Sequence, residues 1–214
     1  MAGEREVRAV QADDAAAGGR FVMVDLGPWQ NLKSAGFPHQ RDRINVTGMG
    51  SGFAAEHLPP AGAVYWCGEV CFRVPDFRHG ANDNMVLQGQ AIPLPPGPCR
   101  HLHFWGFAEG SLSRARLTLV FARGERRGEW LGLSSLGAQS PELPGERPGP
   151  SSPVIRTPVA DFARPIMTWV QRVPVPGDGL LDAIEFEDMP VIHIFALTLE
   201  RPAAPREVSA HDRG

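Results

Sequence analysis

The sequence is poor in tyrosine, of which it has one, and in lysine, since Lys33 is the single lysine among 21 basic residues. These basic residues are outnumbered by 24 acidic ones, which gives a formal net charge of −3 at pH 7. A chain with this balance has no electrostatic basis for binding nucleic acid or an anionic membrane surface. It also lacks any apolar run approaching the roughly 18 residues that a membrane helix needs. We therefore expect no nucleic-acid partner and no membrane partner.

Signals of secretion are also missing. Residues 1–20 are acidic and rich in alanine, and they contain no apolar segment like that of a signal peptide. The three cysteines (Cys67, Cys71 and Cys99) are an odd number, so at least one thiol stays free, whereas small secreted scaffolds carry more cysteines in even number. We expect a cytoplasmic protein in which the three thiols pack as small apolar groups.

Helical periodicity is absent as well. No 12-residue segment shows a 3.6-residue period with caps, and 21 prolines interrupt the chain. Short apolar or alternating segments are present instead; Arg116 to Phe121, for example, alternates with the period of two that is typical of strands. The residues between Tyr65 and Phe72 predict a tight hairpin with Gly68 at a positive φ. Strands are expected at 21–26, 63–66, 70–74, 101–108, 115–122, 127–133, 166–173, 180–186 and 191–199.

About ten short strands joined by turns rich in proline and glycine indicate an all-β fold, an antiparallel two-sheet β-sandwich of the jelly-roll kind. We expect one sandwich domain over residues 21–200, with a disordered arm at 1–20 and a disordered tail at 201–214. The stretch 137–153 is predicted to be a long surface loop, because its prolines interrupt regular structure. Residues 191–199 should form a central strand buried on both faces. The core should contain Leu117, Leu119, Phe121, Ile192 and Ile194.

Three motifs carry a resemblance to a known family. They are VDLGPWQN at 24–31, DNMVLQGQAIPLPPG at 83–97 and MPVIHIFALTL at 189–199. Together they resemble a galactose-binding-like β-sandwich module of the kind appended to bacterial glycoside hydrolases. The likeness extends over about residues 21–200 and implies the sandwich fold and carbohydrate binding, but it names no catalytic residue. The chain departs from the pattern in its first loop, which contains Trp and His where the module usually has an Asn-Asp-Gly turn.

The resemblance also bears on metal ions, because calcium is the commoner ion for this module type. A structural calcium would take oxygen ligands. The candidate ligands are Asp25, Asn31, Asp42, Asp83 and Asn84. Their spacing matches no EF-hand, and the same short polar side chains at Asp83 and Asn84 can instead fix a turn by bonding neighbouring backbone groups.

Two histidines are the best candidates for chemistry. His101 and His103 are two residues apart on an expected strand, so their side chains share one face. With an acid such as Glu187 or Asp188 they could ligate a metal ion or act on a substrate, and His101, His103 and Glu187 are the catalytic candidates. A zinc site that uses the cysteines has less support, because nothing in the spacing brings Cys99 to the hairpin. His193, on the closing strand, is interpreted as a core histidine.

A ligand site is predicted where the 27–45 loop meets the strand that carries the two histidines. Trp29 and Trp105 would stack on a sugar ring. His39, Arg41 and Asp42 would provide hydrogen bonds. A carbohydrate- or glycoside-binding protein is the first hypothesis. The alternative is a small stand-alone tailoring enzyme (a cyclase, isomerase or lyase) that acts on a sugar or natural product, and a third is a structural subunit that meets a protein partner or a second copy of itself.

Overall fold

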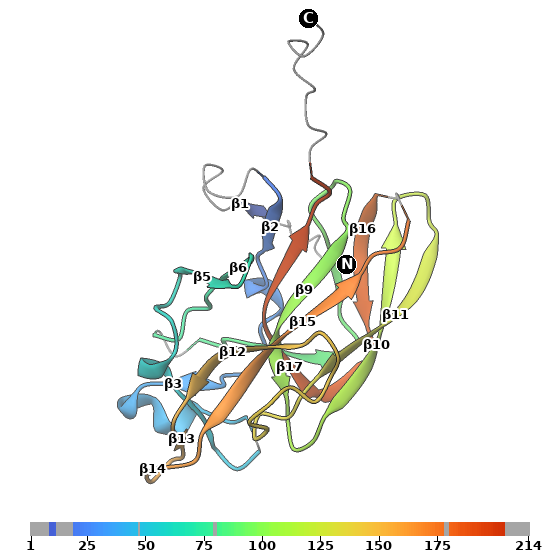
Figure 1. Ribbon diagram of the computed structural model, residues 1–214. Coiled ribbons are helices and arrows are strands. Elements are labelled where there is room, and N and C mark those ends of the chain that lie inside the picture. Colours follow the sequence, from blue (N-terminus) through green and yellow to red (C-terminus); the bar gives the residue numbers. More distant parts are fainter. Residues whose placement is uncertain (1–8, 12–18, 47, 79–80, 178–179, 204–214) are drawn as a thin grey trace, which may run out of the picture.

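The computed structural model describes residues 9–11, 19–46, 48–78, 81–177 and 180–203 (Figure 1). Apart from strands, these residues contain three short 3-10 segments: η1 (Gly27–Trp29), η2 (Pro38–Arg43) and η3 (Ala55–His57). No α-helix occurs among them, and the all-β prediction is confirmed. In this part of the chain, no helix has the length and apolar character needed to cross a membrane.

The main sheet contains the central strand of the molecule. Its order is β1-β2-β17-β9-β15-β12, and β7 also pairs with β17. Neighbouring strands in it are antiparallel. Its members are β1 (Ala9–Gln11), β2 (Phe21–Val24), β7 (Met85–Gln88), β9 (His101–Ala108), β12 (Arg147–Ser152), β15 (Ile166–Pro174) and β17 (Asp188–Glu200).

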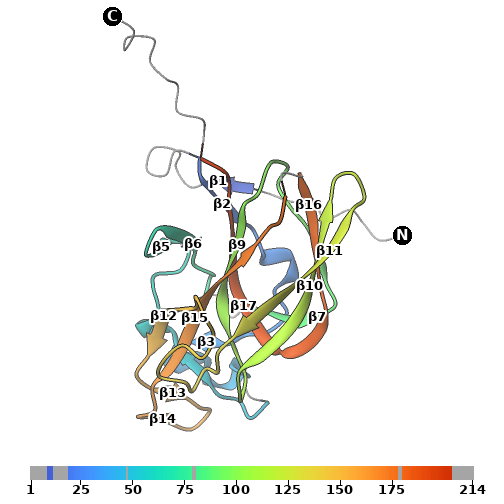
Figure 2. The ribbon, with the colours of Figure 1, turned by 45° about the vertical axis from the view of Figure 1, so that its right-hand side comes forward.

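The second sheet packs face to face with the main sheet (Figure 2). Its antiparallel order is β11-β10-β16-β8. Phe104 of the main sheet meets Phe186 of the second edge to face, with ring centroids 6.1 Å apart. The five core residues predicted from the sequence are all buried. The strands are β8 (Ala91–Pro93), β10 (Ser113–Phe121), β11 (Arg126–Leu133) and β16 (Leu181–Phe186).

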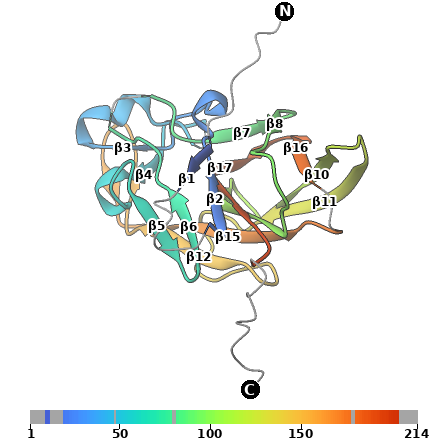
Figure 3. The ribbon, with the colours of Figure 1, turned by 90° about the horizontal axis from the view of Figure 1, so that it is seen from above.

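A third layer covers part of the other face of the main sheet, as the view from above shows for the hairpin β5–β6 (Figure 3). Trp105 packs against Phe72 of this hairpin and Phe107 against Phe53 of β4. Gly68 turns the hairpin at φ +62°, as predicted. The third sheet has the order β14-β13-β4-β3, and its β3–β4 pair is parallel. These strands are β3 (Ala35–Gly36), β4 (Gly52–Ala54), β5 (Val64–Cys67), β6 (Val70–Arg73), β13 (Ile155–Arg156) and β14 (Asp161–Phe162).

Strand β17 is central, as predicted. It lies between β2 and β9, and every residue from Ile192 to Glu200 is buried. Its register against β9 shifts between Ile194 and Ala196. Gly106 of β9 permits this close crossing, because a Cβ at that position would lie 2.1 Å from the carbonyl oxygen of His193. Glycine at position 106 thus allows β9 and β17 to approach each other this closely.

Two stretches expected to be irregular contain strands. Strand β12 lies inside the predicted loop 137–153 and pairs with β15 at the end of the main sheet. An edge strand tolerates Pro148 and Pro150, because one side of it needs no ladder hydrogen bonds. In the predicted arm, Ala9–Gln11 form β1, while residues 1–8 and 12–18 lie outside the described residues. Residues 201–203 of the tail form no strand, and residues 204–214 are also outside.

Candidate functional site

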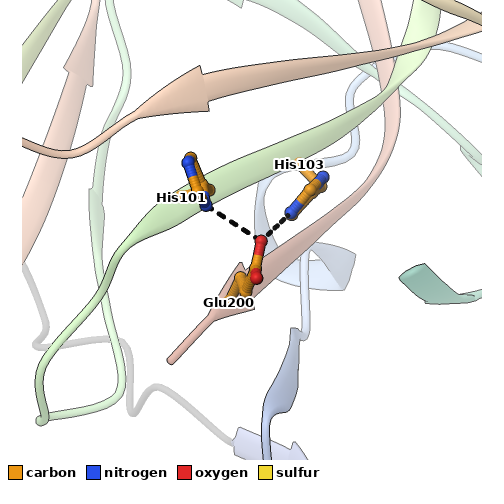
Figure 4. A group of neighbouring side chains, drawn as sticks. All are labelled: His101, His103 and Glu200. Carbon is orange, nitrogen blue, oxygen red and sulfur yellow. Dashed lines mark hydrogen bonds and ion pairs between the residues drawn. The ribbon is translucent and has the colours of Figure 1, made fainter. Parts of the chain in front are cut away.

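Two histidines and one glutamate meet where β9 begins and β17 ends. Antiparallel pairing sets His101 opposite Glu200 and His103 opposite Thr198. Figure 4 shows both imidazoles directed at the Glu200 carboxylate. One oxygen, Oε2, lies 2.9 Å from His101 Nδ1 and 2.9 Å from His103 Nε2. The spacing of two residues therefore places both histidines on one face, as the sequence predicted, but the acid is Glu200.

Arg20 holds the other oxygen of the carboxylate. Its Nη2 and Nε donate to Glu200 Oε1 at 2.5 and 3.2 Å. Burial by itself would raise the pKa of Glu200, but hydrogen bonds from Arg20 and His103 and the neighbouring positive charge outweigh it and lower this pKa to about 2. At neutral pH the group is therefore a carboxylate that accepts hydrogen bonds from three side chains.

The ionised carboxylate fixes the tautomers of both histidines. A carboxylate only accepts hydrogen bonds, so His101 Nδ1 and His103 Nε2 each carry a proton and donate it. Burial lowers the pKa of His103, because it disfavours the charged imidazolium. The ring is thus neutral at pH 7 and its Nδ1 keeps a lone pair. No hydrogen bond within the described residues uses that nitrogen.

A cavity of about 260 Å³ adjoins the cluster. Glu146 is buried in its wall and accepts hydrogen bonds from the backbone N–H and the hydroxyl of Ser134, so its oxygens are already engaged. Arg147 and Arg172 are exposed and line the same cavity, and neither guanidinium has a hydrogen bond or ion pair in the described part of the chain. The complete lining is Arg20, Phe21, Glu69, Val70, His103, Gly145, Glu146, Arg147, Val170, Arg172 and Glu200.

The same cluster has the donor set of a metal site. One ligand atom from each of His101, His103 and Glu200 lies within 4.8 Å of the others. Two imidazoles and a carboxylate suit zinc or a similar first-row transition metal. Within the described residues this is the single group of three or more such side chains. The three cysteines are free and buried and belong to no such group, and burial raises the pKa of each thiol.

Three other residues predicted for the site lie elsewhere. Glu187 is exposed, and its Oε2 accepts a hydrogen bond from the backbone N–H of Arg116 in the second sheet. Trp105 has no exposed surface, and its indole N–H donates to Thr168 Oγ1 at 2.8 Å. Its ring therefore packs the core, which corrects the stacking role predicted for it. Trp29 is half-buried in η1 and packs against the core.

The polar residues of the 27–45 loop lie near the third sheet. His39 is exposed and stacks on Phe37 with ring centroids 6.1 Å apart. Arg41 donates to Asp161 Oδ1 at 2.6 Å, and Asp42 is exposed. In Figures 1 and 2 the third sheet lies at the lower left, whereas β17 ends at the top with Glu200, so the loop and the histidine pair do not form one site.

Most of the side chains proposed as calcium ligands are engaged in hydrogen bonds with the protein itself. Fully buried Asp83 accepts hydrogen bonds from the backbone N–H groups of Ser34 and Ala35 and lies 3.5 Å from Lys33 Nζ. Asp25 instead accepts from the backbone N–H of Gly27, and Asn31 bonds the backbone of Val86. These side chains therefore brace loops, the role that their position before a strand also suggested for Asp83 and Asn84.

Sequence reasoning missed Arg20, Glu200 and the two unpaired arginines. Arg20 and Glu200 are 180 positions apart, so only the pairing of β2 with β17 brings them together. One signal was available for Glu200, which is a charged residue directly after the apolar run that ends at Leu199. A charged side chain at that position on a buried strand needs an oppositely charged or hydrogen-bonding partner.

The cluster and its cavity allow three kinds of chemistry. The unpaired guanidiniums can bind a ligand rich in hydrogen-bond acceptors, His103 can take up a proton at Nδ1, and the two histidines with Glu200 can ligate a metal ion. Neither models of known protein families nor the curated proteins match this chain.

Proposed function

We propose that the protein binds an acidic carbohydrate in the cavity beside His103. The observation that carries the proposal is the pair of unengaged guanidiniums, Arg147 and Arg172, in a cavity where the oxygens of Glu146 and Glu200 already have donors. The third acid of the lining, Glu69, has a side chain that is 84% exposed and lies 3.8 Å from Arg20. The two unengaged guanidiniums therefore offer donors to a ligand, and a sugar carboxylate is a strong acceptor for them.

Size and lining support a single sugar unit. The cavity of about 260 Å³ is close to the lower limit of about 300 Å³ for ligand pockets. Phe21, Val70 and Val170 provide apolar surface against which the C–H face of a sugar ring can pack. The resemblance of the sequence to a carbohydrate-binding sandwich module points to the same class of ligand.

Calorimetric titration with glucuronate and glucose tests the proposal, because the two differ by one carboxylate. We expect glucuronate to bind and glucose to bind at least about tenfold more weakly, as the loss of a charge-assisted hydrogen bond predicts. Arg172→Gln should weaken glucuronate by a similar factor, whereas Arg123→Gln, in an exposed turn, should not. Equal binding of both sugars, or an Arg172 variant that binds like the wild type, would refute the acidic ligand.

One observation favours a second candidate, an enzyme. His103 is neutral, is oriented by Glu200 and has a lone pair at Nδ1, which is the arrangement of a general base held by a carboxylate. Such a base could remove the proton next to a sugar carboxylate, the first step of an isomerase or lyase. Exchange of that proton for deuterium in D₂O, followed by NMR, is the test. His103→Gln should abolish exchange and preserve binding. If the wild type shows no exchange, the enzyme candidate is refuted and only the binding proposal stands.

A further inference from the structure

A second cavity, also of about 260 Å³, lies near the beginning of β17. It is formed by β7, by the turn after β9 and by loops that precede β4. His193 of β17 and Glu109 of the turn are among the residues that line it. None of the described residues that line it is an arginine or a lysine. They are Asn31, Leu32, Asn45, Val46, Gly48, Val86, Gln88, Glu109, Pro190 and His193.

The tautomer of His193 follows from its neighbour Asn84. The Asn84 amide nitrogen donates to the Leu32 carbonyl at 3.0 Å and to Asp83 Oδ1 at 3.2 Å, so its Oδ1 is an acceptor. His193 Nδ1 lies 3.0 Å from that oxygen and must therefore carry the proton. Nε2 is left with a lone pair. Burial lowers the pKa of His193 to about 4, so the ring is neutral at pH 7.

That lone pair has no donor. The His193 side chain is 1% exposed and stacks on Phe107, and Nε2 has no hydrogen-bond partner in the part of the chain that the structure describes. Glu109 Oε2 lies 3.8 Å from it, and no hydrogen bond to the Glu109 carboxylate exists within the described residues. Burial raises the pKa of Glu109. Two acceptors therefore lie 3.8 Å apart at this cavity, and no arginine or lysine of the described residues pairs with the acid.

We propose that this second cavity binds a primary ammonium group, which donates one N–H to His193 Nε2 and another to the Glu109 carboxylate. An ammonium has three N–H donors on one atom and supplies the positive charge that the lining lacks. Asn45 and Gln88 are exposed lining residues that have engaged their side-chain carbonyl oxygens, and within the described residues their side-chain amide N–H groups make no hydrogen bond. These groups suit an oxygen on the body of the same ligand, so a small amino alcohol fits the whole cavity.

NMR titration of the intact chain tests the site, with ethanolamine as probe and ethylene glycol as its neutral counterpart. The imidazole ¹⁵N signals of His193 report directly on Nε2. We expect ethanolamine to shift the Nε2 signal saturably, and ethylene glycol to bind about tenfold or more weakly, because a hydrogen bond to a charged group is the stronger one. Equal affinity would refute the ammonium and leave a neutral hydroxyl site. No shift with either probe would leave a buried water as occupant and overturn the proposal.

Glu109→Gln separates the role of the charge from that of the cavity. It removes a charge from a side chain that is 28% exposed, so the fold should persist, and ethanolamine should bind about ten- to a hundredfold more weakly. Glu125→Gln, beyond the opposite end of β10, is the matched control and should bind like the wild type. An unchanged affinity in the Glu109 variant would contradict the proposed contact. The site stands independently of glucuronate binding in the first cavity, because the two cavities share no lining residue.

Discussion

Arg20 and Glu200 join the beginning and the end of the sandwich, with the guanidinium Nη2 2.5 Å from the carboxylate Oε1. The same carboxylate receives the N–H groups of His101 and His103 through its other oxygen. One side chain therefore both ties β2 to β17 and orients the imidazole of His103. Stability and site geometry are coupled through it.

The first prediction concerns stability in acid. Because the folded-state pKa of Glu200 is about 2, against 4.5 in the unfolded chain, its contribution is fully present above pH 4.5 and is lost as the pH falls towards 2. This shift corresponds to roughly 3 kcal/mol at most. Glu200→Gln should reduce the free energy of unfolding at pH 7 by about 2–3 kcal/mol and flatten its loss between pH 4.5 and 2. Urea unfolding across this range provides the measurement.

Glu69→Gln is the control for that experiment. Glu69 lies 3.8 Å from the same arginine, but its side chain is 84% exposed. We expect a change below about 0.5 kcal/mol. If both variants behave alike, the stabilising role of Glu200 is wrong.

The second prediction concerns His193. Its folded-state pKa of about 4 lies below the ordinary 6.5, so the unfolded chain binds the extra proton between these values. Stability should therefore fall as the pH drops from 6.5 to 4, by roughly 3 kcal/mol at most. His193→Gln should reduce this slope, whatever it costs at pH 7 through lost stacking on Phe107, and the remainder should belong to His103, whose pKa burial also lowers. A slope that is unchanged by the substitution would assign the titration to another group.

The third prediction concerns metal binding at the histidine pair. Zn²⁺ or Ni²⁺ should raise the melting temperature of the wild type, because an ion that binds only the folded chain stabilises it by mass action. A chelator should reverse the shift. His101→Ala and His103→Ala should each lose it, whereas His39→Ala, an exposed histidine outside the cluster, should keep it. Thermal unfolding with and without metal is sufficient, and an equal shift in all three variants would point to nonspecific binding.

The fourth prediction concerns Trp105 as a core residue. Thr168 Oγ1 accepts the indole N–H at 2.8 Å and donates to the carbonyl of Pro150 in β12 at 2.5 Å. Thr168→Val keeps the shape but leaves both groups unsatisfied, so we expect a loss of about 1–3 kcal/mol in unfolding free energy. Unchanged stability in chemical denaturation would contradict this arrangement. Binding of glucuronate should be unaffected, because Trp105 does not line the cavity.

The local sequence pattern was enough to predict most of the longer strands and the histidine pair of the candidate site. Alternation located β10, and apolar runs located β9 and β17, to within a few residues, while the two-residue spacing of His101 and His103 placed them on one face. Such signals are carried by neighbouring residues, which explains why they can be read from a single chain.

The features that were not predicted depend on contacts between residues that are distant in sequence. Glu200 meets the histidines through strand register, and Arg20 meets Glu200 through the pairing of β2 with β17. Trp105 was predicted to stack on a ligand, but an aromatic residue covered by a layer of protein and one covered by a ligand give the same sequence pattern. The prolines at 148 and 150 predicted a loop. This prediction was wrong, because the edge position of β12, which tolerates proline, cannot be read from its own residues.

The position of β17 between β2 and β9 has a consequence for how rigidly the two cavities are held. Its amide groups are bonded to strands on both sides and shielded from water, so their hydrogens should exchange with solvent only when the whole domain unfolds. His193 and Glu200 both project from this strand, one into each cavity. Ligands at either place would therefore find groups already ordered before they arrive, and little entropy would be lost in arranging them.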